Sequence, residues 1–354
     1  MAINLAEKYA SKIQTHFTTQ SLLAGKLSTQ YDFSGVKTVK VYTPQTVPMG
    51  DYTRNGVNRY GTPVEMEDVI QELTLSQDKG FALTIDKGNN MDQMGVKAAG
   101  KMLRLQIDER AIPLADNYGF SQLAQLAGTI VGSGTAIDKT SIIDRISEGT
   151  RVLDDAEVPQ DGRTLFLSNS AYKFLKHSDE FLGIDSLGEK ALAKGVVGEY
   201  DNMKVVKVPS GRWPVGLNFL IVYKNSATMP MKINDTKLHQ DPPGISGNLL
   251  EGRQYYDLFV FGAKAMGVYA DIYTGSGGGT VMTTPTINAG TGAITGGGSG
   301  AVYKYTTDGS DPRYSATAMT GSTITAASGE TMKAFAYSNA AGTYPSSVAE
   351  IVKS

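Results

Sequence analysis

The stretch from Met91 to Asp116 places the strongest constraint on the fold, because its residues are spaced for one long helix. Its polar side chains recur three or four residues apart and form one narrow stripe, consisting of Gln93, Lys97, Lys101, Arg104 and Asp108. The remaining surface is apolar or small, which predicts a helix covered on most sides by its own domain or by neighbouring subunits. Pro113 disfavours helical geometry at Ile112, so we expect the helix to end or kink there.

The composition narrows the possible functions. The chain has 354 residues, enough for two or three domains, and no cysteine, which excludes disulfides and thiolate metal sites. A net charge of −2 gives no overall attraction for nucleic acid or anionic membranes. No signal peptide is visible from Met1 to Lys12, and no apolar run approaches the ~18 residues of a membrane span. We expect a soluble intracellular product.

The region before the long helix is rich in β-prone residues. Residues 36–46 and 69–75 read as strands around a polar, glycine-dotted section at 48–63, which predicts a long two-stranded excursion. A further strand is expected at 81–85. Residues 1–30 suit a short amphipathic helix that packs either on its own domain or on a neighbouring subunit.

After the helix, residues 130–224 alternate between helix and strand and read as a mixed α/β module. Residues 128–134 read as a loop. Ile142, Ile146 and Leu153 predict a helical face after a cap at Asp138 or Thr140, and Ser168 or Asn169 is expected to cap a second helix. The β-prone runs 229–238 and 249–261, on either side of a turn at 241–244, are expected to pair antiparallel.

The composition changes near the C-terminus. Residues 272–303 contain no charged side chain, and Gly275 to Gly279 reads as a flexible linker. Residues 281–354 hold 22 Ser or Thr but eight charged residues, and the expected strands at 302–307, 322–325, 331–337 and 347–352 indicate a small β-sandwich.

No pattern in the sequence indicates catalysis. His16, His177 and His239 lie in separate elements without metal-ligand spacing. No phosphate loop, dinucleotide fingerprint or nucleophile elbow is present. Asp308 and Asp311 read as turn residues rather than calcium ligands. We therefore predict no enzyme and no catalytic, cofactor-binding or metal residues. Long β arms and one long covered helix favour a structural, self-associating protein.

The order of elements resembles the major capsid proteins of tailed bacteriophages, which have the HK97-like fold. The residues that carry this resemblance are Leu73-Thr-Leu-Ser-Gln-Asp-Lys-Gly-Phe-Ala-Leu-Thr-Ile-Asp86, the long helix, Ile112-Pro-Leu-Ala-Asp-Asn-Tyr118, Val158-Pro-Gln-Asp-Gly-Arg-Thr-Leu-Phe-Leu-Ser168 and Gly195-Val-Val-Gly-Glu-Tyr-Asp-Asn-Met-Lys-Val-Val206. It implies an α+β fold made of an N-arm (1–35), an extended β-loop (36–72), a P-domain with the spine helix (73–127 and 225–262) and an A-domain (128–224 and 263–274).

The C-terminal part resembles a different family. Tyr303-Lys-Tyr-Thr-Thr-Asp-Gly-Ser-Asp-Pro312 and Gly329-Glu-Thr-Met-Lys-Ala-Phe-Ala336 are similar to the small immunoglobulin-like module at the C-terminus of chitobiase and β-hexosaminidase enzymes. The resemblance implies an all-β immunoglobulin-like sandwich over residues 281–354, joined by a linker at 275–280. On a capsid subunit it would project outward from the shell.

Together these resemblances imply a major capsid subunit that forms hexamers and pentamers and closes into an icosahedral head around double-stranded DNA. The expected location is the virion, after synthesis in the host cytoplasm. The expected partners are further copies, a separate scaffolding protein, a portal, decoration proteins, non-specifically bound DNA and glycans at 281–354, with no membrane.

Two alternatives remain open. An encapsulin-like nanocompartment shell would need a groove for a cargo peptide, and the sequence indicates none. A carbohydrate-binding or carbohydrate-cleaving protein is suggested by the C-terminal module, but the signal peptide and the catalytic carboxylates that such a protein needs are missing.

Overall fold

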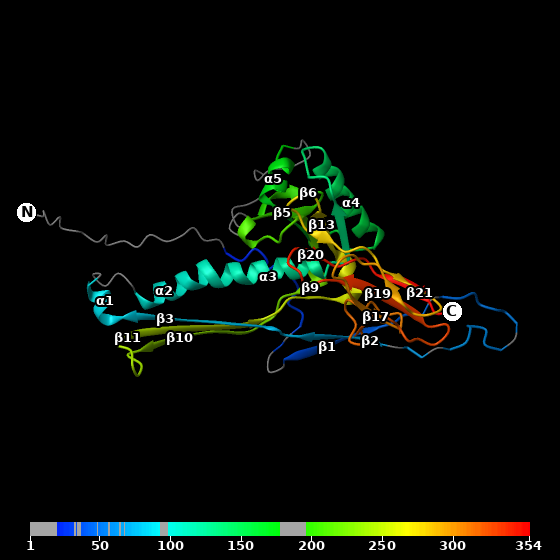
Figure 1. Cartoon of the computed structure of the whole chain (residues 1–354), viewed down its shortest axis with the longest axis horizontal. Coiled ribbons are helices and arrows are strands. Elements are labelled where there is room, and N and C mark those ends of the chain that lie inside the picture. Colours follow the sequence, from blue (N-terminus) through cyan, green and yellow to red (C-terminus); the bar gives the residue numbers. More distant parts are fainter. Residues whose placement is uncertain are drawn as a thin grey trace, which may run out of the picture.

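The computed structural model describes residues 20–354 except 32, 34–36, 48, 56, 64, 67, 93–97 and 178–195. The helix expected within residues 1–30 therefore lies largely outside the described residues. The fold is mixed α+β and has three parts: an elongated body, an α/β part on one side of the body and a C-terminal β-rich part at one end (Figure 1). No described helix is long and apolar enough to cross a membrane.

A long three-stranded antiparallel sheet forms one arm of the body. Its strands are β3 (Gln77–Asp86), β10 (Met231–Gln240) and β11 (Gly247–Tyr256), in the order β10-β11-β3. The predicted antiparallel pair around the 241–244 turn is confirmed, and Asp241 and Gly244 adopt positive φ there. A short helix, α1 (Lys87–Asp92), follows β3, and the long helix runs along the sheet (Figure 1).

The long helix differs from its prediction at both ends. Its described part begins at Ala99, as α2 (Ala99–Gln106), and continues through a π-helical turn, Ile107–Ala111, into α3 (Ile112–Gln125). Of the two outcomes expected at Ile112, an end or a kink, the end is wrong, because α3 continues from Ile112. Pro113 lacks an N–H and its ring would clash with a carbonyl one turn earlier, and the wider π turn directly before it keeps the chain helical. Arg104 and Asp108, one turn apart on the polar stripe, form an ion pair at 3.7 Å.

A second hairpin, with shorter strands, follows on from the long sheet and points in the opposite direction along the body (Figure 1). Strands β1 (Thr38–Pro44) and β2 (Asp68–Thr74) pair antiparallel in continuous register, as the sequence predicts. Their base packs on a small cluster of buried apolar residues that consists of Phe33, Val41, Leu73, Leu75 and Phe261. The loop between the strands extends away from the rest of the chain (Figure 1).

The α/β part is built on a six-stranded mixed sheet with the order β4-β13-β8-β5-β7-β6. Its strands are β4 (Thr129–Ser133), β5 (Arg163–Ser168), β6 (Val196–Tyr200), β7 (Met203–Val208), β8 (Leu217–Tyr223) and β13 (Val268–Tyr273). The prediction of a loop at 128–134 is wrong, because the β-branched residues Thr129, Ile130 and Val131 form the edge strand β4.

Helices α4 (Ser141–Asp155) and α5 (Asn169–Leu175) cover one face of this sheet. Ile142, Ile146 and Leu153 are fully buried against it, as predicted. The Asp138 carboxylate accepts hydrogen bonds from the N–H groups of Thr140 and Ser141, while the Ser168 hydroxyl accepts one from Ala171. The other face packs on α3, so the α/β part and the body share one core.

Short elements join the α/β part to the body. Strands β9 (Ala227–Thr228) and β12 (Phe259–Val260) pair antiparallel, and three 3₁₀ turns lie at Ser210–Arg212, Lys224–Ser226 and Gly262–Gly267.

The C-terminal part, residues 280–354, is all-β in its regular structure. Its main sheet has the order β18-β17-β19-β21, and the two pairs β14–β20 and β15–β16 complete it. The bounds are β14 (Thr280–Val281), β15 (Thr286–Ile287), β16 (Ile294–Thr295), β17 (Val302–Thr306), β18 (Met319–Thr320), β19 (Thr331–Tyr337), β20 (Thr343–Tyr344) and β21 (Ala349–Val352). The strand expected at 322–325 is absent from these described residues, where one isolated bridge joins Thr323 to Ala293.

The expectation of a flexible linker at Gly275–Gly279 is also wrong. The Gly279 N–H donates to the Tyr273 carbonyl at 2.8 Å, and the Gly278 N–H donates to the Gly275 carbonyl. A Cβ on Gly279 would lie 2.7 Å from the Tyr344 ring. The glycines therefore form a tight, packed turn, because only residues without a Cβ allow the backbone to approach so closely.

Candidate functional site

The described residues contain no cluster of three or more side chains able to hold a metal ion. His177 is exposed, and His239 lies on the surface of the long sheet, 3.2 Å from the Glu251 carboxylate. His16 lies outside the described residues. The clearest candidate features of the described residues are exposed surfaces and the buried contacts that position them.

The loop of the β1–β2 hairpin exposes apolar side chains far from any core. Met49 is fully exposed, and Val57 and Tyr60 are 92% and 93% exposed. The rings of Tyr52 and Tyr60 pack edge to face at 4.9 Å, and the Thr53 N–H donates to the Arg59 carbonyl. Large exposed apolar side chains gathered on one loop are typical of a contact surface.

The first half of the long helix is a second candidate contact surface, although its apolar side chains are half-buried rather than exposed. No residue of Ala99–Ala111 is buried, although Met102, Leu103, Leu105 and Ile107 are apolar. The residues that the structure describes therefore do not supply the cover that the sequence predicts for this half. By contrast, α3 buries Phe120, Leu123 and Ala124 completely.

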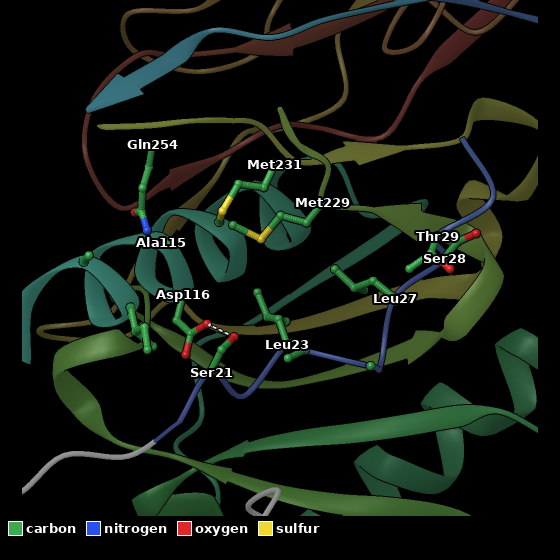
Figure 2. A pocket seen from close by; sticks show the side chains of 14 residues that line it. Ser21, Leu23, Leu27, Ser28, Thr29, Ala115, Asp116, Met229, Met231 and Gln254 are labelled. Carbon is green, nitrogen blue, oxygen red and sulfur yellow. Dashed lines mark hydrogen bonds between the residues drawn. The ribbon is translucent and has the colours of Figure 1, made fainter. Parts of the chain in front are cut away.

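Asp116 on α3 holds the segment that leads to the N-terminus (Figure 2). Its carboxylate accepts from the Ser21 hydroxyl at 2.7 Å, the Leu22 N–H at 3.0 Å and the Arg212 guanidinium at 2.8 Å. The side chains of Asp116 and Arg212 are 2% and 7% exposed, so this is a buried, fully hydrogen-bonded ion pair. Nothing in the sequence predicts this contact, because the Ser21–Leu22 segment, Asp116 and Arg212 follow one another at intervals of about a hundred residues along the chain.

A pocket of about 330 Å³ lies beside this anchor. Leu23 and Leu27 line one side of it, and Met229 and Met231 line the other (Figure 2).

Asp257, like Asp116, is a buried carboxylate that holds a neighbouring segment in place, here at the point where the β1–β2 hairpin joins the long sheet. Its carboxylate accepts from the Ser76 N–H at 2.8 Å and from the Tyr118 hydroxyl at 2.6 Å. Burial, and next the hydrogen bond to Asp257, raise the pKa of the Tyr118 phenol, so it stays a neutral donor. The contact ties α3 to the segment between β2 and β3.

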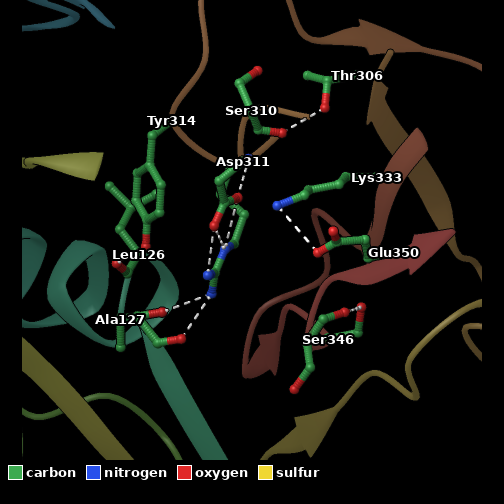
Figure 3. A network of polar contacts seen from close by, with 12 residues as sticks. Leu126, Ala127, Thr306, Ser310, Asp311, Tyr314, Lys333, Ser346 and Glu350 are labelled. Carbon is green, nitrogen blue, oxygen red and sulfur yellow. Dashed lines mark hydrogen bonds and ion pairs between the residues drawn. The ribbon is translucent and has the colours of Figure 1, made fainter. Parts of the chain in front are cut away.

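The C-terminal part docks on the end of α3 (Figure 3). The Arg313 guanidinium donates to the carbonyls of Ala127 at 3.1 Å and Gly128 at 3.0 Å, and the Tyr314 hydroxyl donates to the Leu126 carbonyl at 2.8 Å. Asp311 holds the guanidinium in place at 2.8 Å. Ala127 and Gly128 lie just after the end of α3, and the C-terminal end of a helix carries partial negative charge, so a buried cation there is favourable.

Further contacts fix the C-terminal part to two other regions. The Ala316 N–H donates to the Ile70 carbonyl of β2, and the Tyr344 hydroxyl donates to the Val215 carbonyl of the α/β part. Tyr314 also packs on Gly262, where an added Cβ would lie 2.8 Å from the tyrosine Cβ. The C-terminal part thus contacts the helix, the hairpin and the α/β part at once.

No protein-family model matches the sequence, and no curated protein matches it. Solved structures do match in fold. A solved structure from Mycobacterium phage Che8 covers 77% of this chain and 100% of its own, at 18% identity and a TM-score of 0.60. The capsid structure of the cyanophage P-SCSP1u covers 77% of this chain and 94% of its own, at 12% identity and a TM-score of 0.59.

A third structure, the asymmetric unit of the mature capsid of bacteriophage PhiM1, covers 77% of this chain and 92% of its own, at 11% identity and a TM-score of 0.56. The chain has a phage capsid fold. Each of these matches leaves a little under a quarter of the chain uncovered. The uncovered length is close to that of residues 281–354.

Proposed function

We propose that this protein is a structural subunit of a phage head, and that its work is to contact copies of itself. The observation that carries the proposal is the exposed apolar loop of the β1–β2 hairpin on a chain with a phage capsid fold. A lone chain would leave Met49, Val57 and Tyr60 in water, whereas neighbouring copies would cover them. The half-covered helix Ala99–Ala111 supports the same conclusion.

In the HK97-like scheme, we assign residues 1–35 to the N-arm and 36–72 to the extended loop. Residues 73–127 and 225–262 form the P-domain, and 128–224 with 263–274 form the A-domain. Residues 275–280 connect to the immunoglobulin-like module, 281–354, on the outside of the shell. Hexamers and pentamers close into an icosahedral head around DNA, with a scaffolding protein, portal and decoration proteins as partners. Many weak contacts, repeated by closed symmetry, stabilise the particle.

Size-exclusion chromatography and electron microscopy of the expressed chain test this proposal. We expect shells or capsomers for the wild type, alone or with its scaffolding protein, and loss of them in Met49→Ser/Tyr60→Ser, which removes apolar contact area from the loop. Met319→Ser is the matched control, because Met319 is an exposed methionine on the C-terminal part. A wild type that stays monomeric under all these conditions would contradict the proposal.

A further inference from the structure

The C-terminal sheet turns two different faces to its surroundings. On β19, Met332, Ala334 and Ala336 are fully buried, and the first two lie in the module's own core. The alternate residues Phe335 and Tyr337 lie on the opposite face, where Lys304 of β17 stands directly across from Phe335. This outer face contributes nothing to the module's core.

The outer face forms one wall of a pocket whose other wall is the end of α3. The pocket has a volume of about 280 Å³ and is lined by Gln125, Leu126, Lys304, Arg313, Phe335, Tyr337, Ser338, Asn339, Thr343 and Pro345. It exists because Arg313 docks the module on the helix, so both parts of the chain are needed to form it. The volume lies near the lower end of the usual range for ligand sites, which suits a ligand of about one ring.

The lining combines the accessible ring of Tyr337 with neutral polar groups, while the neighbouring Phe335 is only 6% exposed. The rings of Phe335 and Tyr337 lie 5.7 Å apart and are tilted by 33°. The amides of Gln125 and Asn339 and the hydroxyl of Ser338 supply donors and acceptors around them. Such a lining suits a ligand that is apolar on one face and hydroxylated at its edge, which is the chemistry of a sugar ring.

The charges of the lining point to an anionic ligand. No carboxylate lines the pocket. Arg313 already binds Asp311 and the helix carbonyls, whereas Lys304 forms no ion pair within the described part of the chain. The Lys304 ammonium lies 5.9 Å from the centre of the Tyr337 ring, at the same site as the aromatic surface.

We propose that this pocket binds a sugar that carries a carboxylate, with the ring on Tyr337 and the carboxylate at Lys304. The inference deepens the glycan-binding role expected for residues 281–354 and rests on the proposed placement of that module outside the shell. Recognition is by one terminal acidic sugar, because the pocket is too small for a longer oligosaccharide.

The test is ligand-observed NMR and calorimetric titration of the full chain with N-acetylneuraminic acid, glucuronic acid and glucose. We expect saturable binding of an acidic sugar in the millimolar range, at least tenfold tighter than that of glucose. Tyr337→Ala and Asn339→Ala are expected to weaken binding at least tenfold. Lys304→Gln is expected to remove the preference for the acid. Lys232→Gln is the matched control, since this lysine also lies 5.9 Å from a tyrosine ring, on the distant β10.

Absence of saturable binding by any acidic sugar would overturn the proposal, as would equal effects of Lys304→Gln and Lys232→Gln. Equal affinity for glucose and glucuronic acid would overturn the role of Lys304. Asn339 is exposed, so its variant tests the pocket even if Tyr337→Ala does not fold. Electron microscopy of the same samples reports on shell assembly separately, so failure to bind sugar and failure to assemble are distinguished.

Discussion

Asp116 shows how a single residue determines where a whole segment lies. The stretch from Ser21 to Leu27 has no regular secondary structure, yet Leu22, Leu23 and Leu27 are buried. The carboxylate of Asp116 satisfies the Leu22 N–H and the Ser21 hydroxyl, while Arg212 neutralises its charge. A sequence pattern cannot reveal such a site, because local periodicity carries no information about partners this far apart.

Removing one member of this pair leaves a buried charge without compensation. We expect Arg212→Ala to lower the free energy of unfolding by about 3 kcal/mol, measured by urea denaturation. Lys40→Ala is the control, because the Lys40–Glu72 pair is exposed and screened by solvent, so its loss is expected to change stability little. Equal losses in the two variants would show that Asp116 is not an anchor.

Asp138 gives a prediction for the dependence of α4 on pH. Hydrogen bonds from the Ser141 N–H and hydroxyl hold the pKa of this carboxyl below its ordinary value of 3.8. Its stabilising effect is therefore present above pH 3.8 and is lost as the pH falls through the lowered pKa. We expect the protection of amides in the first turn of α4, measured by hydrogen exchange relative to the intrinsic rates, to fall below pH 3.8 in the wild type, with a weaker pH dependence in Asp138→Asn. The same acid response in both proteins would rule out the cap as its cause.

At the scale of elements, a helix or strand could be predicted from the sequence where interactions between residues close in the sequence determine it. The strands β10 and β11 and the buried faces of α4 were predictable, because hydrophobic spacing and turn residues determine them. The continuation of the helix past Pro113 was not predictable from the sequence. A π turn directly before the proline accommodates its ring, and tertiary packing holds α3 in place. The tight turn at Gly275–Gly279 was missed because glycine permits both flexibility and close packing.

Gly119 and Gly100 provide a matched test of how closely α3 and α2 are each packed against the rest of the chain. A Cβ on Gly119 in α3 would lie 2.4 Å from Leu23 Cδ1, whereas one on Gly100 in α2 would meet nothing within 4 Å. We expect Gly119→Ala to destabilise the protein by about 1–3 kcal/mol. Gly100→Ala is expected to be neutral or to stabilise it by up to about 1 kcal/mol. Thermal unfolding measures both, and destabilisation by Gly100→Ala would mean that α2 is covered.

At the scale of the whole molecule, the sequence was sufficient for the mixed α+β class and for the likeness to phage capsids, both of which are confirmed. It did not show how the C-terminal part sits on the rest. Arg313 lies in an ordinary turn sequence, and its partners at Ala127 and Gly128 are backbone carbonyls, which leave no trace in side-chain patterns. The immunoglobulin-like character of that part stays a prediction.

The docking of the C-terminal part on the end of α3 can be tested by its effect on proteolysis of the connecting segment, residues 275–280. Arg313→Ala removes the donor to the end of α3 and leaves Asp311 without its partner, so we expect proteases to cleave within 275–280 at least tenfold faster. Tyr314→Phe is expected to accelerate cleavage less than Arg313→Ala does. It removes only one hydrogen bond, which contributes about 1 kcal/mol to the docking of the C-terminal part. Arg104→Ala, on the exposed face of α2, is the control. An unchanged cleavage rate in Arg313→Ala would show that other contacts hold the module.

The attachment of the C-terminal part to three regions at once has a consequence for avidity. Because the module cannot swing freely on a tether, neighbouring modules on a closed shell would be held at one spacing and in one orientation. Ligand groups that matched this spacing would be bound with a high effective concentration, and mismatched ones would engage a single site. A surface lattice of weak sites can in this way distinguish dense from sparse arrays of the same ligand.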